Sequence, residues 1–142
     1  YVQSLLGFKK EDHAAFDWQS GIVKTHGKRE RELPLIPGTF DNLSQQLAIR
    51  CSAKLGTDTM QFSVVKRSKQ KDYVFERMGE ETIDTDLGPL DTIVYRRVQD
   101  TDERTTRFWV APELNHMLVR LHQTEKKDSL DVTLELSQVT FD

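Results

Sequence analysis

The clearest pattern in this chain is the alternation of apolar and polar residues near its end. Between Leu130 and Leu136 every second residue is apolar, and polar residues stand between them. A period of two predicts a β-strand with one buried face and one solvated face. Shorter runs of the same kind recur along the chain between turn residues, a spacing typical of antiparallel β proteins. We therefore expect a mainly β fold: a curved antiparallel sheet, built as a meander and resembling a half-barrel.

Turn residues divide the chain into the expected strands. The strands before the middle of the chain are expected at about residues 1–8 and, as a pair joined by Ser20-Gly21, within 14–35. The later strands are expected at about residues 59–67, 73–79, 81–90 with a bend at Gly88-Pro89, 90–98, 104–110, 117–124 and 129–137. Pro34 and Pro37 end the early pair, because proline cannot donate a hydrogen bond to a sheet.

One segment has the period of a helix instead. Apolar residues recur at every fourth position in it: Leu43, Leu47, Cys51 and Leu55. This spacing predicts one α-helix at about residues 42–55, packed on the sheet with the apolar stripe in the core. Asp41 or Asn42 can cap its start, and Gly56 can supply the left-handed residue that ends it.

The stretch FWVAPELNHMLVRL, residues 108–121, joins two apolar runs and contains Glu113 and His116. On a helix, Glu-x-x-His places two metal ligands on one face. Pro112 precedes the pair, however, and the connection is short, so a bend between two strands is the better interpretation. The remaining histidines and Cys51 show no close metal-ligand spacing, and we expect no metal site.

Composition narrows the class of protein. The 142 residues are 37% hydrophobic and 30% charged with a net charge of −3, which indicates one globular domain, residues 1–142. Acidic and basic residues are interspersed, which argues against nucleic acid, and the apolar runs are too short to span a membrane. A single cysteine excludes an internal disulfide bond. No nucleophile has a recognisable activating base, so we expect no catalytic residues, no cofactor and no enzymatic activity.

Arginines gather on the strands of the last third of the chain: Arg96, Arg97, Arg104, Arg107 and Arg120. Arg96 and Arg97 must point to opposite sides of a sheet, because successive strand residues alternate. An arginine beside an apolar surface can hold the carboxylate or phosphate of a ligand, whereas pairing with acidic residues across strands is the alternative. The candidate ligand contacts are the arginines and aromatic residues Arg96, Arg120, Phe62, Phe108 and Trp109.

Four segments, FDWQSG, GTFDNLSQQLAIR, TDLGPLDTIVYRRV and TRFWVAPELNHMLVRL, lie in this order between residues 16 and 121. Together they resemble the bacterial family catalogued as domain of unknown function 3108, over about residues 16–136. The resemblance implies an exported protein of Gram-negative bacteria, located in the periplasm or cell envelope. It also implies a further N-terminal β segment, so that this chain is the C-terminal two-thirds of a larger β domain.

The same resemblance implies a fold similar to the lipoprotein carriers LolA and LolB, in which a curved sheet with an apolar concave face surrounds a helix. The family has no established activity, so no functional residue carries over. We therefore keep three function classes. The first is a periplasmic module that binds a lipid or another apolar ligand. The second is an envelope assembly protein that binds a partner, or a second copy of itself, through an exposed strand edge. The third and least favoured is an enzyme such as a hydrolase.

Overall fold

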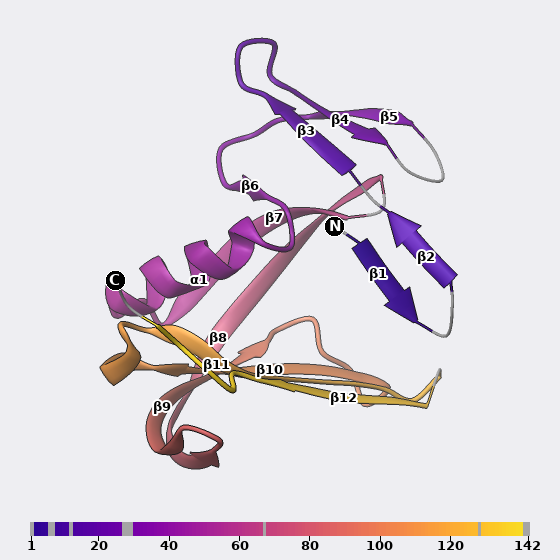
Figure 1. Cartoon of the computed structure of the whole chain (residues 1–142). Coiled ribbons are helices and arrows are strands. Elements are labelled where there is room, and N and C mark those ends of the chain that lie inside the picture. Colours follow the sequence, from indigo (N-terminus) through magenta and orange to yellow (C-terminus); the bar gives the residue numbers. More distant parts are fainter. Residues whose placement is uncertain are drawn as a thin grey trace. The chain divides into compact units, whose positions relative to one another are not determined.

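The chain is mainly β, as expected. Figure 1 shows the computed structural model, which describes residues 2–5, 8–11, 13–26, 30–66, 68–127 and 129–140, the first two ranges by their backbone alone. Within these residues there is one α-helix, α1 (Ser44–Lys54), inside the predicted range 42–55. The strands are β1 (Val2–Leu5), β2 (Phe8–Glu11), β3 (His13–Asp17), β4 (Ile22–His26), β5 (Arg31–Pro34), β6 (Thr39–Phe40), β7 (Thr59–Lys66), β8 (Lys69–Thr85), β9 (Gly88–Arg97), β10 (Arg104–Ala111), β11 (Met117–Glu125) and β12 (Leu130–Glu135).

These strands form three sheets. β1 pairs with β2, and β3, β4 and β5 form a three-stranded antiparallel sheet. The third sheet has seven strands in the order β12-β11-β10-β9-β8-β7-β6. Its β6–β7 pair is parallel, and the pairs from β8 to β12 are antiparallel, as the sequence predicted. A strand of two residues adds this parallel pair before the chain turns into α1.

Two compact units divide the chain. One comprises residues 1–45 and 61–72, and the other comprises residues 46–60 and 73–142. In the first unit, the predicted Ser20-Gly21 turn joins β3 to β4, and Val23 and Thr25 of β4 are buried. Phe40 and Phe62 meet there edge to face, with ring centroids 5.7 Å apart. The expectation that residues 1–142 form a single domain stays a prediction.

The second unit is an antiparallel meander of β8 to β12, and its central strand β10 is buried on both faces. Phe108 lies between Phe75 and Tyr95 on one face, with ring centroids 5.0 and 5.2 Å away. On the other face Trp109 packs in an apolar cluster: Ile83, Leu90, Val94, Trp109, Ala111 and Val119. The far end of the β8–β9 hairpin curls round to supply part of this cluster (Figure 1). This curl confirms the half-barrel-like sheet that the sequence predicted.

Strand β8 is longer than expected. It runs through from Lys69 to Thr85, where the sequence suggested two strands, 73–79 and 81–90. A bulge between Arg77 and Gly79 keeps the strand continuous, since the register against β9 shifts at that point. Gly79 has φ of 145°, a backbone conformation that residues with a Cβ rarely adopt.

Helix α1 turns its predicted apolar stripe toward solvent. Leu47 is 61% exposed, and Leu43, Cys51 and Leu55 are exposed as well, while Ile49 and Ala53 on the opposite side are buried. Two long-range hydrogen bonds fix this rotation. Arg50 Nε donates to the Asn115 carbonyl (2.8 Å), and the Tyr95 hydroxyl donates to the Thr57 carbonyl (3.2 Å). The expectation of a buried stripe was therefore wrong.

The ends of α1 follow the predicted chemistry. Asp41, and not Asn42, is the cap: its Oδ1 accepts the N–H groups of Leu43 (3.1 Å) and Ser44 (2.7 Å). Ser44 Oγ accepts the Asp41 N–H in return at 2.9 Å, which completes a reciprocal cap. Gly56 ends the helix with φ of 71°.

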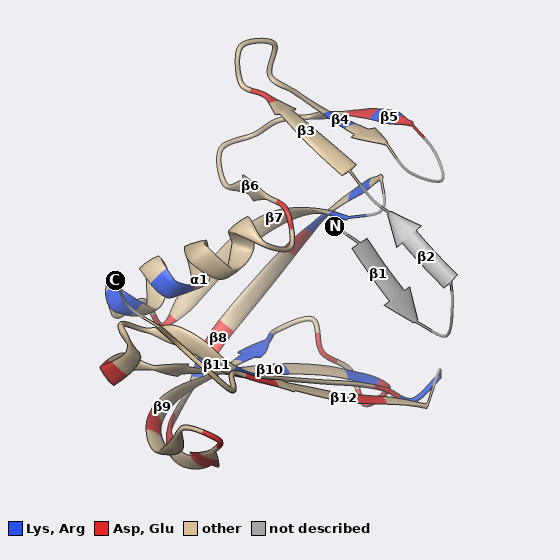
Figure 2. Cartoon of the chain, viewed as in Figure 1, with Lys and Arg blue, Asp and Glu red and all other residues tan. Residues whose placement is uncertain are grey.

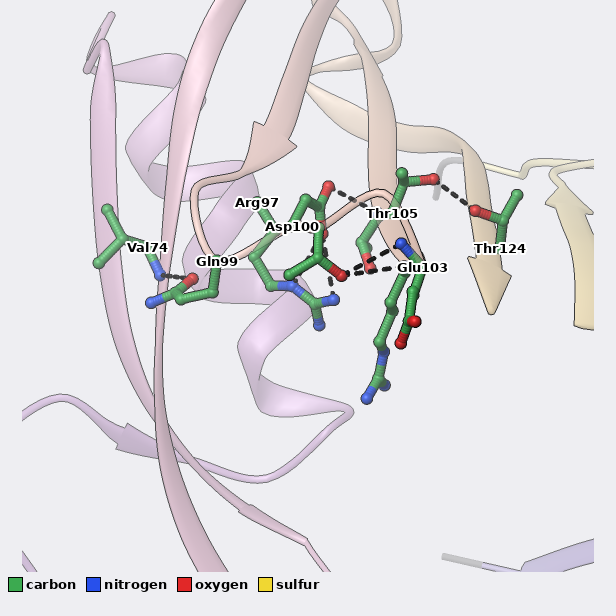
Figure 3. A network of polar contacts seen from close by, with 10 residues as sticks. Val74, Arg97, Gln99, Asp100, Glu103, Thr105 and Thr124 are labelled. Atoms are coloured by element: carbon green, nitrogen blue, oxygen red, sulfur yellow. Dashed lines mark hydrogen bonds and ion pairs between the residues drawn. The ribbon is translucent and has the colours of Figure 1, made fainter. Parts of the chain in front are cut away.

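A buried ion pair organises the turn between β9 and β10 (Figure 3). Arg97 Nη2 lies 3.1 Å from Asp100 Oδ1, and the two side chains are 8% and 15% exposed. Asp100 Oδ2 accepts the backbone N–H of Thr106 at 2.7 Å, and the Arg97 guanidinium lies 5.4 Å from the centre of the Tyr73 ring. The pair therefore joins three strands, β8, β9 and β10.

The rotation of α1 predicts unequal effects of two substitutions on its two sides. Ile49→Ala removes buried methyl groups and should lower the free energy of unfolding by about 2–5 kcal/mol. Leu47→Ala should change it by less than about 0.5 kcal/mol, as at other surface positions. Urea denaturation of both variants checks this, and a larger loss at Leu47 than at Ile49 would contradict the orientation of the helix.

The ion pair of the β9–β10 turn predicts a large loss at a single acidic residue. Asp100→Ala leaves Arg97 buried without its counter-charge and should cost about 3–5 kcal/mol of unfolding free energy. Asp102 lies in the same turn but is exposed, so Asp102→Ala is the matched control and should cost little. Equal unfolding midpoints for the two variants in urea would show that the pair contributes nothing.

Candidate functional site

The five residues predicted to contact a ligand do not converge. Phe62 belongs to the first unit and is buried beside Phe40, whereas the other four belong to the second. Phe108 and Trp109 are neighbours in β10 and lie on opposite faces of it, each buried in its own cluster. These aromatic side chains are already packed against protein, so an acyl chain would have to displace core residues to reach them.

Arg120 and Trp109 form part of a polar network across four strands. The Trp109 indole Nε1 donates to Glu81 Oε2 at 2.9 Å, and the Arg120 guanidinium lies 5.9 Å from the Trp109 ring. Arg120 also donates to Glu135 Oε2 (Nε, 2.8 Å) and to the carbonyl of Asp84 (2.6 Å). This network connects β8, β10, β11 and β12 and gives Arg120 a structural role in the sheet.

Arg96 lies in a separate cross-strand pair with Glu76 of β8. The Nε and Nη2 atoms of Arg96 lie 2.6 and 2.5 Å from Glu76 Oε1. This is the pairing that the sequence left open as the alternative to ligand binding. Whether Arg96 or Arg120 also contacts a ligand stays a prediction.

Strand β12 exposes two leucines at the edge of the meander. It lies at the end of the strand order, beside β11 alone. Leu130 and Leu134 are 40% and 59% exposed, while Val132 is half-buried. The sequence predicted that the whole alternating set was buried, which is wrong for these two leucines. We take the free edge and leucine face of β12 as the candidate functional site, and call it the β12 edge.

The backbone of the β12 edge presents unused hydrogen-bonding groups. The Leu136 N–H donates to the Val119 carbonyl at 2.9 Å, and the register continues as Leu134 opposite Leu121 and Val132 opposite Gln123. In an antiparallel ladder the hydrogen-bonded residues alternate, so the even-numbered residues of β12 bond to β11. Asp131, Thr133 and Glu135 therefore direct their N–H and C=O groups away from the sheet.

The acidic side chains of the β12 edge are paired within the chain. Figure 2 shows acidic positions along β12. Glu135 bonds to Arg120, and Asp131 Oδ1 lies 2.8 Å from His122 Nε2. Both partners belong to β11, so these pairs hold the two strands together on the face opposite to the leucines. On the leucine face, Glu125 of β11 lies opposite Leu130.

The Glu113 and His116 pair lies in the bend between β10 and β11, as expected. Residues Pro112–Leu114 form one turn of 3₁₀-helix, and Asn115 and His116 then adopt positive φ of 55° and 59°. This turn allows Ala111 to pair with Met117 at the start of β11. The expected absence of a metal site stays a prediction; among the described residues no three His, Cys, Asp or Glu side chains gather in a metal-binding group.

An open cleft of about 370 Å³ lies over the β8–β9 hairpin. Five of its seven lining residues are polar, among them Glu80, Glu81 and Asp91. Such a lining does not suit an apolar ligand. In the described part of the chain, no helix has the length and apolar character needed to cross a membrane.

Curated proteins and solved structures gave no match to this chain. One family does match, over residues 4–136, a range that includes β12 and most of both units. The chain therefore belongs to the family described as "Protein of unknown function (DUF3108)".

Proposed function

We propose that this chain is a non-enzymatic interaction module of the periplasm or cell envelope, which binds an extended apolar-sided polypeptide segment at the β12 edge. The observation that carries the proposal is an edge strand with two exposed leucines, Leu130 and Leu134, on one face. Exposed edge strands with apolar side chains are rarely left without a covering element in proteins. The location follows from the family resemblance alone.

A polypeptide fits the β12 edge better than an acyl chain does. The outward N–H and C=O groups of Asp131, Thr133 and Glu135 need hydrogen-bonding partners, which an added strand supplies and a hydrocarbon does not. The ionisable groups near the edge, Arg120 with Glu135 and His122 with Asp131, are bonded to each other across the strands. Because these ionisable groups are bonded to each other, the β12 edge suits binding better than catalysis.

The proposal predicts saturable binding of a strand-forming peptide. The probe is the synthetic peptide SLDVTLEL, the sequence of residues 129–136, labelled for fluorescence anisotropy. Leu134→Lys should weaken its binding at least about tenfold, because burial of one leucine contributes about 1.5–3 kcal/mol. Leu47→Lys, on the outer side of α1, is the matched control and should bind the peptide like the unmodified chain.

Two results would contradict this function. One is the absence of saturable binding, with a scrambled peptide giving the same anisotropy. The other is an equal effect of Leu134→Lys and Leu47→Lys, which would place the peptide elsewhere on the protein.

A second candidate function is the binding of a lipid or other apolar ligand, and the exposed stripe of α1 favours it. Leu47, Cys51 and Leu55 line the outer side of the helix, and the charged residues of α1 are both basic, Arg50 and Lys54 (Figure 2). An apolar stripe beside basic residues is typical of helices that contact lipid chains and anionic headgroups.

Titration with a fluorescent fatty acid separates the two functions. If the lipid function is correct, the probe binds saturably, and Leu47→Lys reduces binding while Leu134→Lys does not. In the peptide experiment the expected effects are reversed: Leu134→Lys weakens binding and Leu47→Lys does not. A linear, non-saturating signal for every variant would exclude the α1 stripe as a lipid site.

A further inference from the structure

The residues of β12 are complementary to those of a second copy of the same strand. When two β12 strands run antiparallel with Val132 facing Val132, Leu130 of each copy lies opposite Leu134 of the other. The exposed leucines then form one continuous apolar row across the junction. Residues opposite each other in a sheet share a face, so this register buries apolar side chains against apolar side chains.

The same register satisfies the outward backbone groups. Asp131 of one copy lies opposite Thr133 of the other, and these odd-numbered residues carry the unused N–H and C=O groups. Pairing them forms about four hydrogen bonds between the two strands. Val132 then occupies a position between the bonded pairs, where side chains approach most closely.

Charge does not oppose this contact. Asp131 faces the neutral Thr133 of the second copy, so no carboxylate stands directly opposite another. Arg120 pairs with Glu135, and His122 with Asp131, within each chain. A register shifted to put Thr133 opposite Thr133 would place Asp131 against Glu135, which like charges disfavour.

We infer that the partner of the β12 edge is a second copy of this chain, joined by antiparallel β12–β12 pairing with Val132 at the two-fold axis. This inference rests on the proposed function, because it names the segment that the β12 edge binds. The paired strands are short, so the contact buries less surface than a standard stable interface, which buries about 1,200–2,000 Å². The dimer is therefore weak and forms only as concentration rises.

Sedimentation velocity over a range of concentrations tests the dimer. The unmodified chain should shift from monomer to dimer, with a dissociation constant between about 1 µM and 1 mM. Leu134→Lys places two ammonium groups in the contact and should raise that constant at least about tenfold, whereas Leu47→Lys should leave it unchanged. Thr133→Pro gives a second test: it removes an outward N–H without breaking a bond to β11.

Cysteine cross-linking tests the register. In a Cys51→Ser background, Val132→Cys should form a disulfide-linked dimer on mild oxidation by dissolved oxygen, since facing Cα atoms at such a position are about 4.5 Å apart. Thr133→Cys should not, because its counterpart lies two residues along the partner strand, beyond the about 7 Å limit for a disulfide. Both variants must first match the unmodified chain by circular dichroism.

Several outcomes would overturn the inference. A monomer at every concentration would do so, and so would a dimer that Leu134→Lys and Thr133→Pro leave intact. Cross-linking of Thr133→Cys with none at Val132→Cys would also overturn it, because that result fixes the other register. None of these outcomes decides the proposed function, which depends on whether the peptide binds the edge of the monomer.

Discussion

The second unit depends on a strand that is buried on both sides. Four consecutive residues of β10, Phe108 to Ala111, are almost wholly inaccessible to solvent. Since neighbouring strand residues point in opposite directions, each face of β10 needs its own cover. Phe75 and Tyr95 cover one face, and the curled end of the β8–β9 hairpin covers the other. The curl of the sheet thus follows from the apolar run FWVA, which an open sheet with one wet face could not accommodate.

Charged side chains near this core mainly link neighbouring strands. Arg97 with Asp100 fixes the β9–β10 turn, and Arg120 links β11 to β12 through Glu135. Arginine suits this work, because its planar group can bond an acceptor and lie along an aromatic ring at once, as Arg120 does with Trp109. Of the five arginines that the sequence grouped together, Arg96, Arg97 and Arg120 form ion pairs with acidic residues of the same chain.

Local features of the fold could be predicted from the sequence, and features that depend on distant residues could not. The β11–β12 hairpin and the bend at Pro112 follow from alternation and turn residues, which act over a few positions. The rotation of α1 could not be predicted, because Asn115 and Tyr95, far along the chain, supply the bonds that set it. Alternation likewise showed that Leu130 and Leu134 share a face, but not whether another element covers that face. Because the pattern does not show whether a strand face is covered, the sequence did not reveal the β12 edge as a candidate site.

The bulge in β8 changes the side of the sheet that the following side chains face. Before it, Arg77 lies opposite Tyr95, and Phe75 joins the aromatic cluster; after it, Gly79 lies opposite Val94, and Ile83 joins the cluster around Trp109. Phe75 and Ile83 are an even number of residues apart, so in a regular strand both would face the same side. One extra residue therefore lets a single strand contribute to two cores. Loss of one residue between Arg77 and Gly79 would invert every side chain beyond it, which makes this short segment far less tolerant of insertions and deletions than the turns at either end of the strand.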